Sequence, residues 1–287
     1  MSIRKGLKLF KIIFLILISV LLLNVMWYFF FPDVSKLKKE NPKKTSFMEY
    51  REQEWQKKGK NIISRQNWVQ LSRISSYLTK AVLIGEDDKF YKHEGFDFEA
   101  IQKAVEKDIK EKKFKFGGST ISQQLAKNLY LSPSKNPLRK LKEVILTWRI
   151  ERNLTKKRIL ELYLNVAECG EGIFGIEAAS YHYYGKPASA LNPEESARLA
   201  SVLPNPRKYN PLGTSKYVAS RSAIIYNIMV KRGIVIPDYE EIMEGARDAK
   251  PDSTENPPTA SQDKNIDDAK SDANKIQSLL EGPQGKN

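Results

Sequence analysis

The chain has very few of the residues that build covalent or metal cross-links: one cysteine, Cys169, and two histidines, His93 and His182. A single cysteine cannot form a disulfide within the chain, so the folded state has to be stabilised by packing. Nothing in the sequence places a base beside Cys169, so we expect an inert thiol and not a nucleophile. Because zinc sites draw on several Cys and His ligands, these counts disfavour a dedicated zinc site.

Charge is absent from a long N-terminal stretch. Residues 12–31, IIFLILISVLLLNVMWYFFF, contain no charged side chain. At about 1.5 Å per residue, a helix of this length crosses a hydrocarbon core of roughly 30 Å. The preceding segment 1–11 is basic, and no small-residue cleavage pattern comes before Pro32, which is typical of an uncleaved signal anchor. We therefore expect a transmembrane helix at 12–31, segment 1–11 in the cytoplasm and the bulk of the chain outside it.

The chain as a whole is strongly basic, with 48 Lys and Arg against 34 Asp and Glu and a formal net charge of +14. Residues 135–158 alone contain nine Lys or Arg and two Glu. An excess of this size favours a polyanionic partner, which is nucleic acid, anionic lipid headgroups or a phosphorylated substrate. Net charge by itself does not choose among these three.

Three regions follow the expected anchor. Residues 32–67 are polar and rich in lysine, and we expect a juxtamembrane stalk there with a short helix near 47–57. Residues 68–236 carry apolar residues at helical spacing and form the expected folded domain. Residues 237–287 contain many charges and several prolines, a composition typical of a disordered polar tail.

The apolar spacing within 68–236 predicts a mainly helical domain, because few runs alternate with a period of two. Ser119, Thr155 and Asn192 are candidate N-caps, and Gly233 is a candidate C-terminal stop. The expected helices lie at 73–86, 97–112, 119–131, 138–153, 156–167, 172–184, 193–202 and 216–231.

An acidic run stands out in this basic chain. Residues 86–95, EDDKFYKHEG, begin with Glu86, Asp87 and Asp88 directly after the apolar letters AVLIG. A carboxylate at the edge of a buried helix is desolvated, which raises its pKa toward that of a general base. The simpler interpretation is a solvated helix end, with His93 as a cap or a core residue.

A second motif, GGSTISQQLAKN at 117–128, places two glycines and a Ser-Thr pair at the start of an expected helix. Free N–H groups and the helix dipole at such an end suit an anion. The same letters could form part of a DNA-reading helix-turn-helix, an interpretation that the membrane span disfavours. Further along, Arg139, Lys142 and Glu143 fall within about one helical turn, a mixture able to bind a diphosphate while keeping one carboxylate.

Together these segments resemble the peptidoglycan glycosyltransferases (glycosyltransferase family 51), the lysozyme-like enzymes that polymerise lipid II. The similarity covers about residues 70–212, with five motifs in the family's order. EDDKFYKHEG resembles EDxxFxxHxG, GGSTISQQLAKN resembles GGSTITQQLxKN, and RKLKE resembles RKxxE. ILELYLNVAECGEGIFGIEAASYHYYGK and LNPEESARLASVLPNPRKYNP resemble the remaining two. An anchor followed by one such domain is similar to the monofunctional branch of the family.

The resemblance implies a mainly α, lysozyme-like domain that performs an inverting transfer. In that reaction Glu86 is the general base that deprotonates the 4-hydroxyl of the acceptor, and a polyprenyl diphosphate leaves. Glu143, the second family carboxylate, either orients cations or helps to hold a divalent ion, Mg²⁺ or Mn²⁺, and no covalent cofactor is expected. The residues implied to bind or shape the substrate site are Asp87, Ser119, Thr120, Gln123, Gln124, Lys127, Asn128, Lys135, Arg139, Lys140 and Lys142.

The implied partners are lipid II, the growing lipid-linked glycan strand and other cell-wall synthesis proteins, and no nucleic acid is expected. The implied location is the cytoplasmic (inner) membrane, with the catalytic domain on its extracytoplasmic side. Two other functions fit parts of the sequence. One is a lysozyme-like hydrolase or lytic transglycosylase, which needs no diphosphate-binding patch, and the other is a membrane-anchored nucleic-acid binder.

Overall fold

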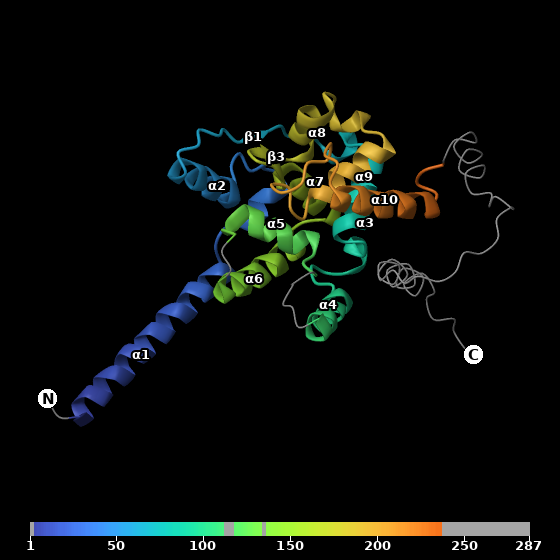
Figure 1. The fold of residues 1–287 in the computed structure, drawn as a ribbon. Helices are drawn as coiled ribbons and strands as arrows, with labels where there is room; N and C mark the ends of the chain where they lie inside the picture. Colours follow the sequence, from blue (N-terminus) through green and yellow to red (C-terminus); the bar gives the residue numbers. More distant parts are fainter. Residues whose placement is uncertain (1–2, 112–117, 134–135, 237–287) are drawn as a thin grey trace, which may run out of the picture. The chain divides into compact units, whose positions relative to one another are not determined.

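A computed structural model describes residues 3–111, 118–133 and 136–236 (Figure 1). The expected tail at 237–287 and the predicted substrate contact Lys135 lie outside these residues. The described part is mainly helical, which confirms the predicted fold class. Its α-helices are α1 (Ile3–Met26), α2 (Ser46–Lys57), α3 (Ser76–Glu86), α4 (Phe98–Glu111), α5 (Ile121–Tyr130), α6 (Pro137–Asn153), α7 (Lys156–Val166), α8 (Ile176–Tyr184), α9 (Pro193–Val202) and α10 (Lys216–Lys231).

The helix α1 is long and apolar enough to cross a membrane. Most of its large hydrophobic side chains are exposed, as expected for a surface that meets lipid. It ends at Met26 and is followed by the 3₁₀ helix Trp27–Phe29. The end of α1 and this 3₁₀ helix both lie within the candidate membrane span Lys8–Lys38, which covers the predicted span 12–31. Arg149 of α6 donates hydrogen bonds of 3.0 Å to the backbone oxygens of Tyr28 and Phe30, which joins the end of the anchor to the folded domain.

The core of the domain is made by two groups of helices. The helix α3 packs against α9 and α10, and α5 packs against α6 and α7 (Figure 1). Leu78 of α3, Leu125 of α5, Leu160 of α7 and Leu199 of α9 are fully buried in one continuous cluster. This packing holds the C-terminal end of α3 beside the N-terminal end of α5, where the backbone N–H of Ile121 donates to the side chain that follows α3.

The predicted capping and stop residues are confirmed with one exception. Thr155 and Asn192 cap α7 and α9 through their side-chain oxygens, and Gly233, with φ of +65°, follows the end of α10. The prediction that Ser119 caps α5 is wrong, because Thr120 accepts the hydrogen bond from the backbone N–H of Gln123. The Gln123 side chain accepts in return from the Thr120 N–H, so a capping box begins this helix.

A small sheet, not foreseen from the sequence, lies beside α8. Its strands are β1 (Arg65–Gln66), β2 (Glu168–Gly170) and β3 (Ile173–Phe174), in the order β1–β3–β2. The predicted helix at 172–184 therefore starts too early, because α8 begins at Ile176. Gly175 separates strand from helix with φ of +78°, and a Cβ there would lie 2.6 Å from the backbone oxygen of Asn165.

The segment 32–67 is part of the folded domain, which corrects the prediction of a stalk. Val34 is fully buried in the main core, and the expected short helix is present as α2. Met48 and Trp55 of α2 form a second buried cluster with Phe174 of β3. Although this segment is rich in lysine, it also contains large apolar side chains that face the domain.

Candidate active site

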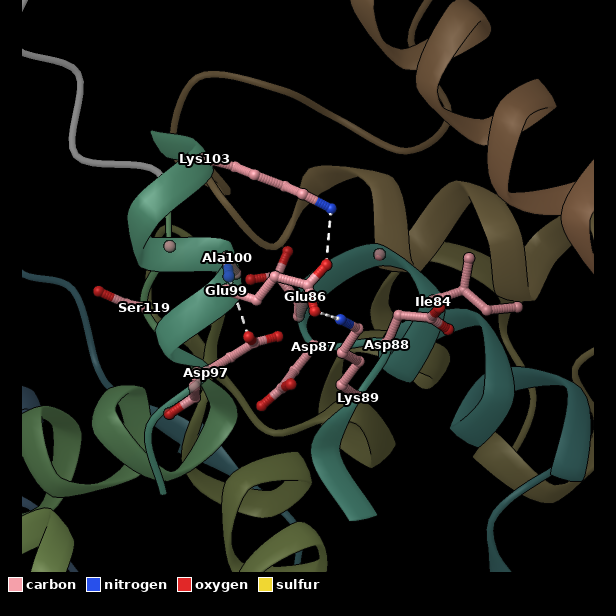
Figure 2. Close-up of a pocket in the computed structure, with 13 residues that line it drawn as sticks. Ile84, Glu86, Asp87, Asp88, Lys89, Asp97, Glu99, Ala100, Lys103 and Ser119 are labelled. Atoms are coloured by element: carbon pink, nitrogen blue, oxygen red, sulfur yellow. Dashed lines mark hydrogen bonds and ion pairs between the residues drawn. The ribbon is translucent and has the colours of Figure 1, made fainter. Parts of the chain in front are cut away.

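An acidic cavity of about 280 Å³ lies where α3 ends and α4 and α5 begin (Figure 2). Both Lys89 and Lys103 pair with Glu99 at its α4 side, as the dashed lines in Figure 2 show. The carboxylates that line it are Glu86, Asp87, Asp88, Asp97 and Glu99. Acids thus outnumber cations in this cavity, although the chain as a whole is basic.

Glu86, the predicted base, is the last residue of α3 and its side chain is 7% exposed. Gln124 of α5 donates a hydrogen bond of 2.8 Å to its Oε2. Its Oε1 lies 3.5 Å from Nη2 of Arg221 and accepts no hydrogen bond from any residue that the structure describes. Burial raises the pKa of Glu86, against the opposing effects of Gln124, Arg221 and Lys127. A carboxylate with a raised pKa and one oxygen that accepts no hydrogen bond is suited to accept a proton.

Two residues that the sequence did not single out hold Glu86 in place. Tyr163 of α7 is fully buried, and its hydroxyl donates at 3.1 Å to Oε1 of Gln124. Burial raises the pKa of Tyr163 well above its ordinary value, so the phenol keeps its proton and directs the NH₂ group of Gln124 at Glu86. Arg221 of α10 donates at 2.6 Å to the backbone oxygen of Gly85, directly before Glu86.

Asp87 joins the end of α3 to the start of α5. Its Oδ2 accepts from the backbone N–H of Ile121 at 2.9 Å, and its Oδ1 lies 2.9 Å from Nε2 of His93. The backbone N–H of Gly95 donates at 3.1 Å to Nδ1 of His93, which places the imidazole proton on Nε2, facing Asp87. With both oxygens engaged, Asp87 is a positioning residue. Glu86, Asp87, His93 and Gly95 of the EDDKFYKHEG motif therefore belong to one structural unit.

We expect Asp87→Asn to destabilise the protein by about 2–3 kcal/mol, because one of two buried donors would then face an amide NH₂ group. Urea denaturation followed by circular dichroism measures this change. Asp88→Asn is the matched control, since Asp88 is half exposed and pairs with Arg232 at the surface, where we expect a loss within about 1 kcal/mol. Equal losses in the two variants would contradict the positioning role.

A basic cavity of about 350 Å³ lies on the other side of Gln124. Four cations line it: Arg51, Lys127, Arg139 and Arg207. Glu168 is the one acid among its lining residues. Gln124 borders this cavity while it donates to Glu86, so a single side chain separates the candidate base from the cations.

Lys127 of α5 is a half-buried cation of the basic cavity. Its ammonium lies over the Phe47 ring, 5.7 Å from the centroid. Burial lowers the pKa of Lys127, and the charges of Glu143 and Glu86 act in the opposite direction. A desolvated cation interacts more strongly with an incoming anion than a surface lysine does.

Glu143 is 2% exposed and lies on α6. Arg139 and Lys140 each donate to a different one of its carboxylate oxygens, and Lys140 also donates to the Ser119 hydroxyl at 3.3 Å. Within residues 3–111, 118–133 and 136–236, no three Asp, Glu, His or Cys side chains are grouped to hold a metal ion. Both carboxylate oxygens of Glu143 are engaged by cations. Its two expected roles, the orientation of cations and help in holding a divalent ion, stay predictions.

The other predicted contacts divide into three groups. Ser119 and Asn128 line the acidic and the basic cavity, respectively. Thr120, which also lines the acidic cavity, forms the capping box of α5 with Gln123. Lys142 is not brought to either cavity, because its ammonium lies over the Tyr28 ring, 4.8 Å from the centroid. The functional candidates that sequence reasoning missed are Arg51, Tyr163, Glu168, Arg207 and Arg221.

Comparison with known proteins gives a consistent result. A family model described as Transglycosylase matches residues 54–230. A biosynthetic peptidoglycan transglycosylase of Nitrosospira multiformis is 42% identical over 222 residues, which are 77% of this chain and 96% of the relative. A protein of the same name from Azoarcus sp. is 51% identical over 191 residues, 67% of this chain and 82% of the relative. Another, from Methylobacillus flagellatus, is 43% identical over 210 residues, 73% of this chain and 92% of the relative.

Proposed function

This chain belongs to the Transglycosylase family, and we propose that its two cavities carry the two halves of one transfer reaction. The chain is a peptidoglycan glycosyltransferase that polymerises glycan strands in cell wall synthesis. The observation that carries the assignment of roles is the hydrogen bond of 2.8 Å from Gln124 to Glu86. It places a buried carboxylate with a raised pKa directly beside a cavity lined by four cations.

Glu86 removes the proton from the 4-hydroxyl of the acceptor N-acetylglucosamine. The resulting oxygen attacks C1 of the donor N-acetylmuramic acid, and the bond from C1 to the diphosphate oxygen breaks. The electron pair leaves with the polyprenyl diphosphate, and the configuration at C1 changes from α to β. Lys127 and Arg139 stabilise the negative charge that develops on the leaving group, since preorganised cations act most strongly where charge increases in the transition state.

The remaining polar residues position these groups. Glu143 holds Arg139 and Lys140 at fixed places on α6, and Asp87 fixes the end of α3 against α5. Asn128 contributes an amide to the basic cavity. Arg139 and Lys140 engage both oxygens of Glu143, so the role we propose for this carboxylate is to orient these two cations.

Anchoring serves the same reaction. Both substrates carry lipid tails, so an enzyme tethered by α1 in the cytoplasmic membrane meets them at a higher effective concentration. We place the domain on the extracytoplasmic side, where cell-wall precursors are polymerised, and other cell-wall synthesis proteins are its proposed neighbours there.

Incubation of the full chain, purified in detergent, with lipid II tests the proposal. Glycan polymer resolved by gel electrophoresis, together with released polyprenyl diphosphate, is the expected result. Preformed glycan strands serve as the second substrate, because a lysozyme-like hydrolase would cut them. Cleavage of these strands without any polymerisation of lipid II would overturn the assignment.

A further inference from the structure

The basic cavity contains an acid that its protein neighbours do not fully satisfy. The Glu168 side chain, on β2, is 8% exposed, and its Oε2 accepts from Nη2 of Arg51 at 2.8 Å. Its Oε1 is buried and accepts no hydrogen bond from the part of the chain that the structure describes. Leaving a buried carboxylate oxygen without a donor is unfavourable, and most such oxygens in folded proteins have a partner. The missing donor is therefore expected from a ligand in the cavity that Glu168 lines.

The surrounding charges define what kind of donor this is. Arg51, Lys127, Arg139 and Arg207 line the same cavity and would repel a cationic ligand. They attract an anion, while Oε1 of Glu168 needs a hydrogen-bond donor that carries no negative charge. A ligand that fits both demands has a phosphate group and a neutral hydroxyl or amide N–H close to each other. A sugar diphosphate has both.

We infer that Glu168 recognises the donor sugar, by accepting a hydrogen bond at Oε1 from the ring whose C1 carries the diphosphate. This inference rests on the proposed function, which places that diphosphate beside Lys127. The ring of N-acetylmuramic acid has two donors of its own, the acetamido N–H and the 6-hydroxyl. A bond from either one to Glu168 fixes the rotation of the ring, and so holds C1 in line with the attacking oxygen.

The partners of Glu168 suggest why burial is tolerated. Burial raises the pKa of its carboxyl group, and the charges of Arg51, Arg207 and Lys127 oppose this effect. The ion pair with Arg51 keeps Oε2 occupied, so Oε1 is the oxygen left for the substrate. Glu54 accepts from the same two arginines, Arg51 at 2.8 Å and Arg207 at 3.2 Å, yet it does not line the cavity.

The test compares steady-state polymerisation of lipid II by the full-length wild type, Glu168→Gln and Glu54→Gln. In Glu168→Gln the amide oxygen faces Arg51, so an NH₂ group replaces the acceptor that meets the sugar. We expect kcat/KM to fall by at least about tenfold, the usual size for a lost hydrogen bond to a charged group. Glu54→Gln disturbs the same arginines without touching the cavity, and we expect it to remain within about threefold of the wild type.

A Glu168→Gln variant within twofold of the wild type overturns the inference, and so do equal losses in both variants, which would trace the effect to Arg51. Melting curves check that both variants fold. If Glu168→Gln does not fold, the wild-type enzyme is tested on lipid II and on two lipid II analogues. One analogue lacks the 6-hydroxyl of N-acetylmuramic acid, and the other carries a methyl group on its acetamido nitrogen in place of the N–H. A loss of about tenfold on one analogue supports the inference, and no loss on either overturns it. A wild type that does not polymerise lipid II would instead defeat the proposed function on which the inference rests.

Discussion

Glu86→Gln is expected to lower kcat for lipid II polymerisation by about 10²–10⁴-fold, the range that a positioned general base contributes. Glutamine has nearly the same shape, and its amide oxygen can still accept from Gln124, so the geometry at the end of α3 is retained. What the variant loses is the ability to take the proton of the acceptor hydroxyl. Single-turnover assays with lipid II measure the change without interference from product release.

Asp88→Asn provides the control for this prediction. Asp88 is two residues further along the same acidic run and lines the same cavity, but it pairs with Arg232 and is half exposed. We expect its turnover to stay within about fivefold of the wild type. A Glu86→Gln enzyme that retains a tenth of the wild-type rate would remove Glu86 from the base role, because a water molecule or another group would then be accepting the proton.

Glu86→Gln is expected to lower activity but to raise the stability of the folded protein. Folding raises the pKa of Glu86 above 4.5, so the folded protein binds this proton more tightly than the unfolded chain does. Wild-type stability therefore falls as pH rises from 4.5 through the folded-state pKa of Glu86. Above that pKa the full loss of stability from ionising the buried carboxyl group is present. We expect Glu86→Gln to melt at a higher temperature than the wild type at neutral pH, with the difference shrinking as pH falls toward 4.5. Calorimetry across this pH range measures it.

The helices were predictable because long apolar periodicity and capping residues are local signals. The sheet was not, because β1 and β3 are two residues long and too short to show a period of two. The prediction of a stalk at 32–67 was wrong for a different reason. Its composition is dominated by lysine, and only the fold reveals that Val34 and Trp55 face buried clusters.

The residues of the active site also fall into two groups, those that the sequence could identify and those that only the fold reveals. Glu86 and Lys127 stand in letter patterns that carry the family resemblance, so the sequence could name them. Tyr163 and Glu168 reach the site from α7 and β2 and stand in the fourth motif, but nothing in its spacing separates a functional side chain from a packing one. Arg221 reaches the site from α10 and lies outside all five motifs. Their contribution depends on which elements the fold brings together, as with the bond from Tyr163 to Gln124.

Lys142 shows the limit of reasoning from spacing alone. It was grouped with Arg139 and Glu143 because all three fall near one helical turn. Successive residues on a helix are about 100° apart, and Lys142 directly precedes Glu143, so the two side chains point in different directions. The structure places Lys142 against the Tyr28 ring beside the anchor, while Arg139, four residues before Glu143, pairs with it.

Lys127→Met is expected to lower kcat by about 10²–10³-fold, similar to the loss of one preorganised group that stabilises charge in the transition state. Methionine fills similar space against the Phe47 ring but cannot meet the charge that develops on the departing diphosphate. Folding lowers the pKa of Lys127 below 10.5, so the wild type should lose activity with rising pH earlier than an ordinary lysine would dictate. Together with the raised pKa of Glu86, this gives a bell-shaped pH profile that is narrower than reference carboxyl and ammonium groups would produce.

Lys142→Met is the matched control, since it removes the same kind of charge from the same basic region but not from a cavity-lining side chain. We expect its kcat to remain within about threefold of the wild type, and its pH profile to keep both limbs. Lys127→Met should keep the acidic limb, which belongs to Glu86, and lose the basic one. If both variants lost activity equally, net charge near the membrane would explain the effect, and the separate role of the basic cavity would fail. If Lys127→Met kept the basic limb, that limb would belong to another group and the leaving-group role of Lys127 would have to be abandoned.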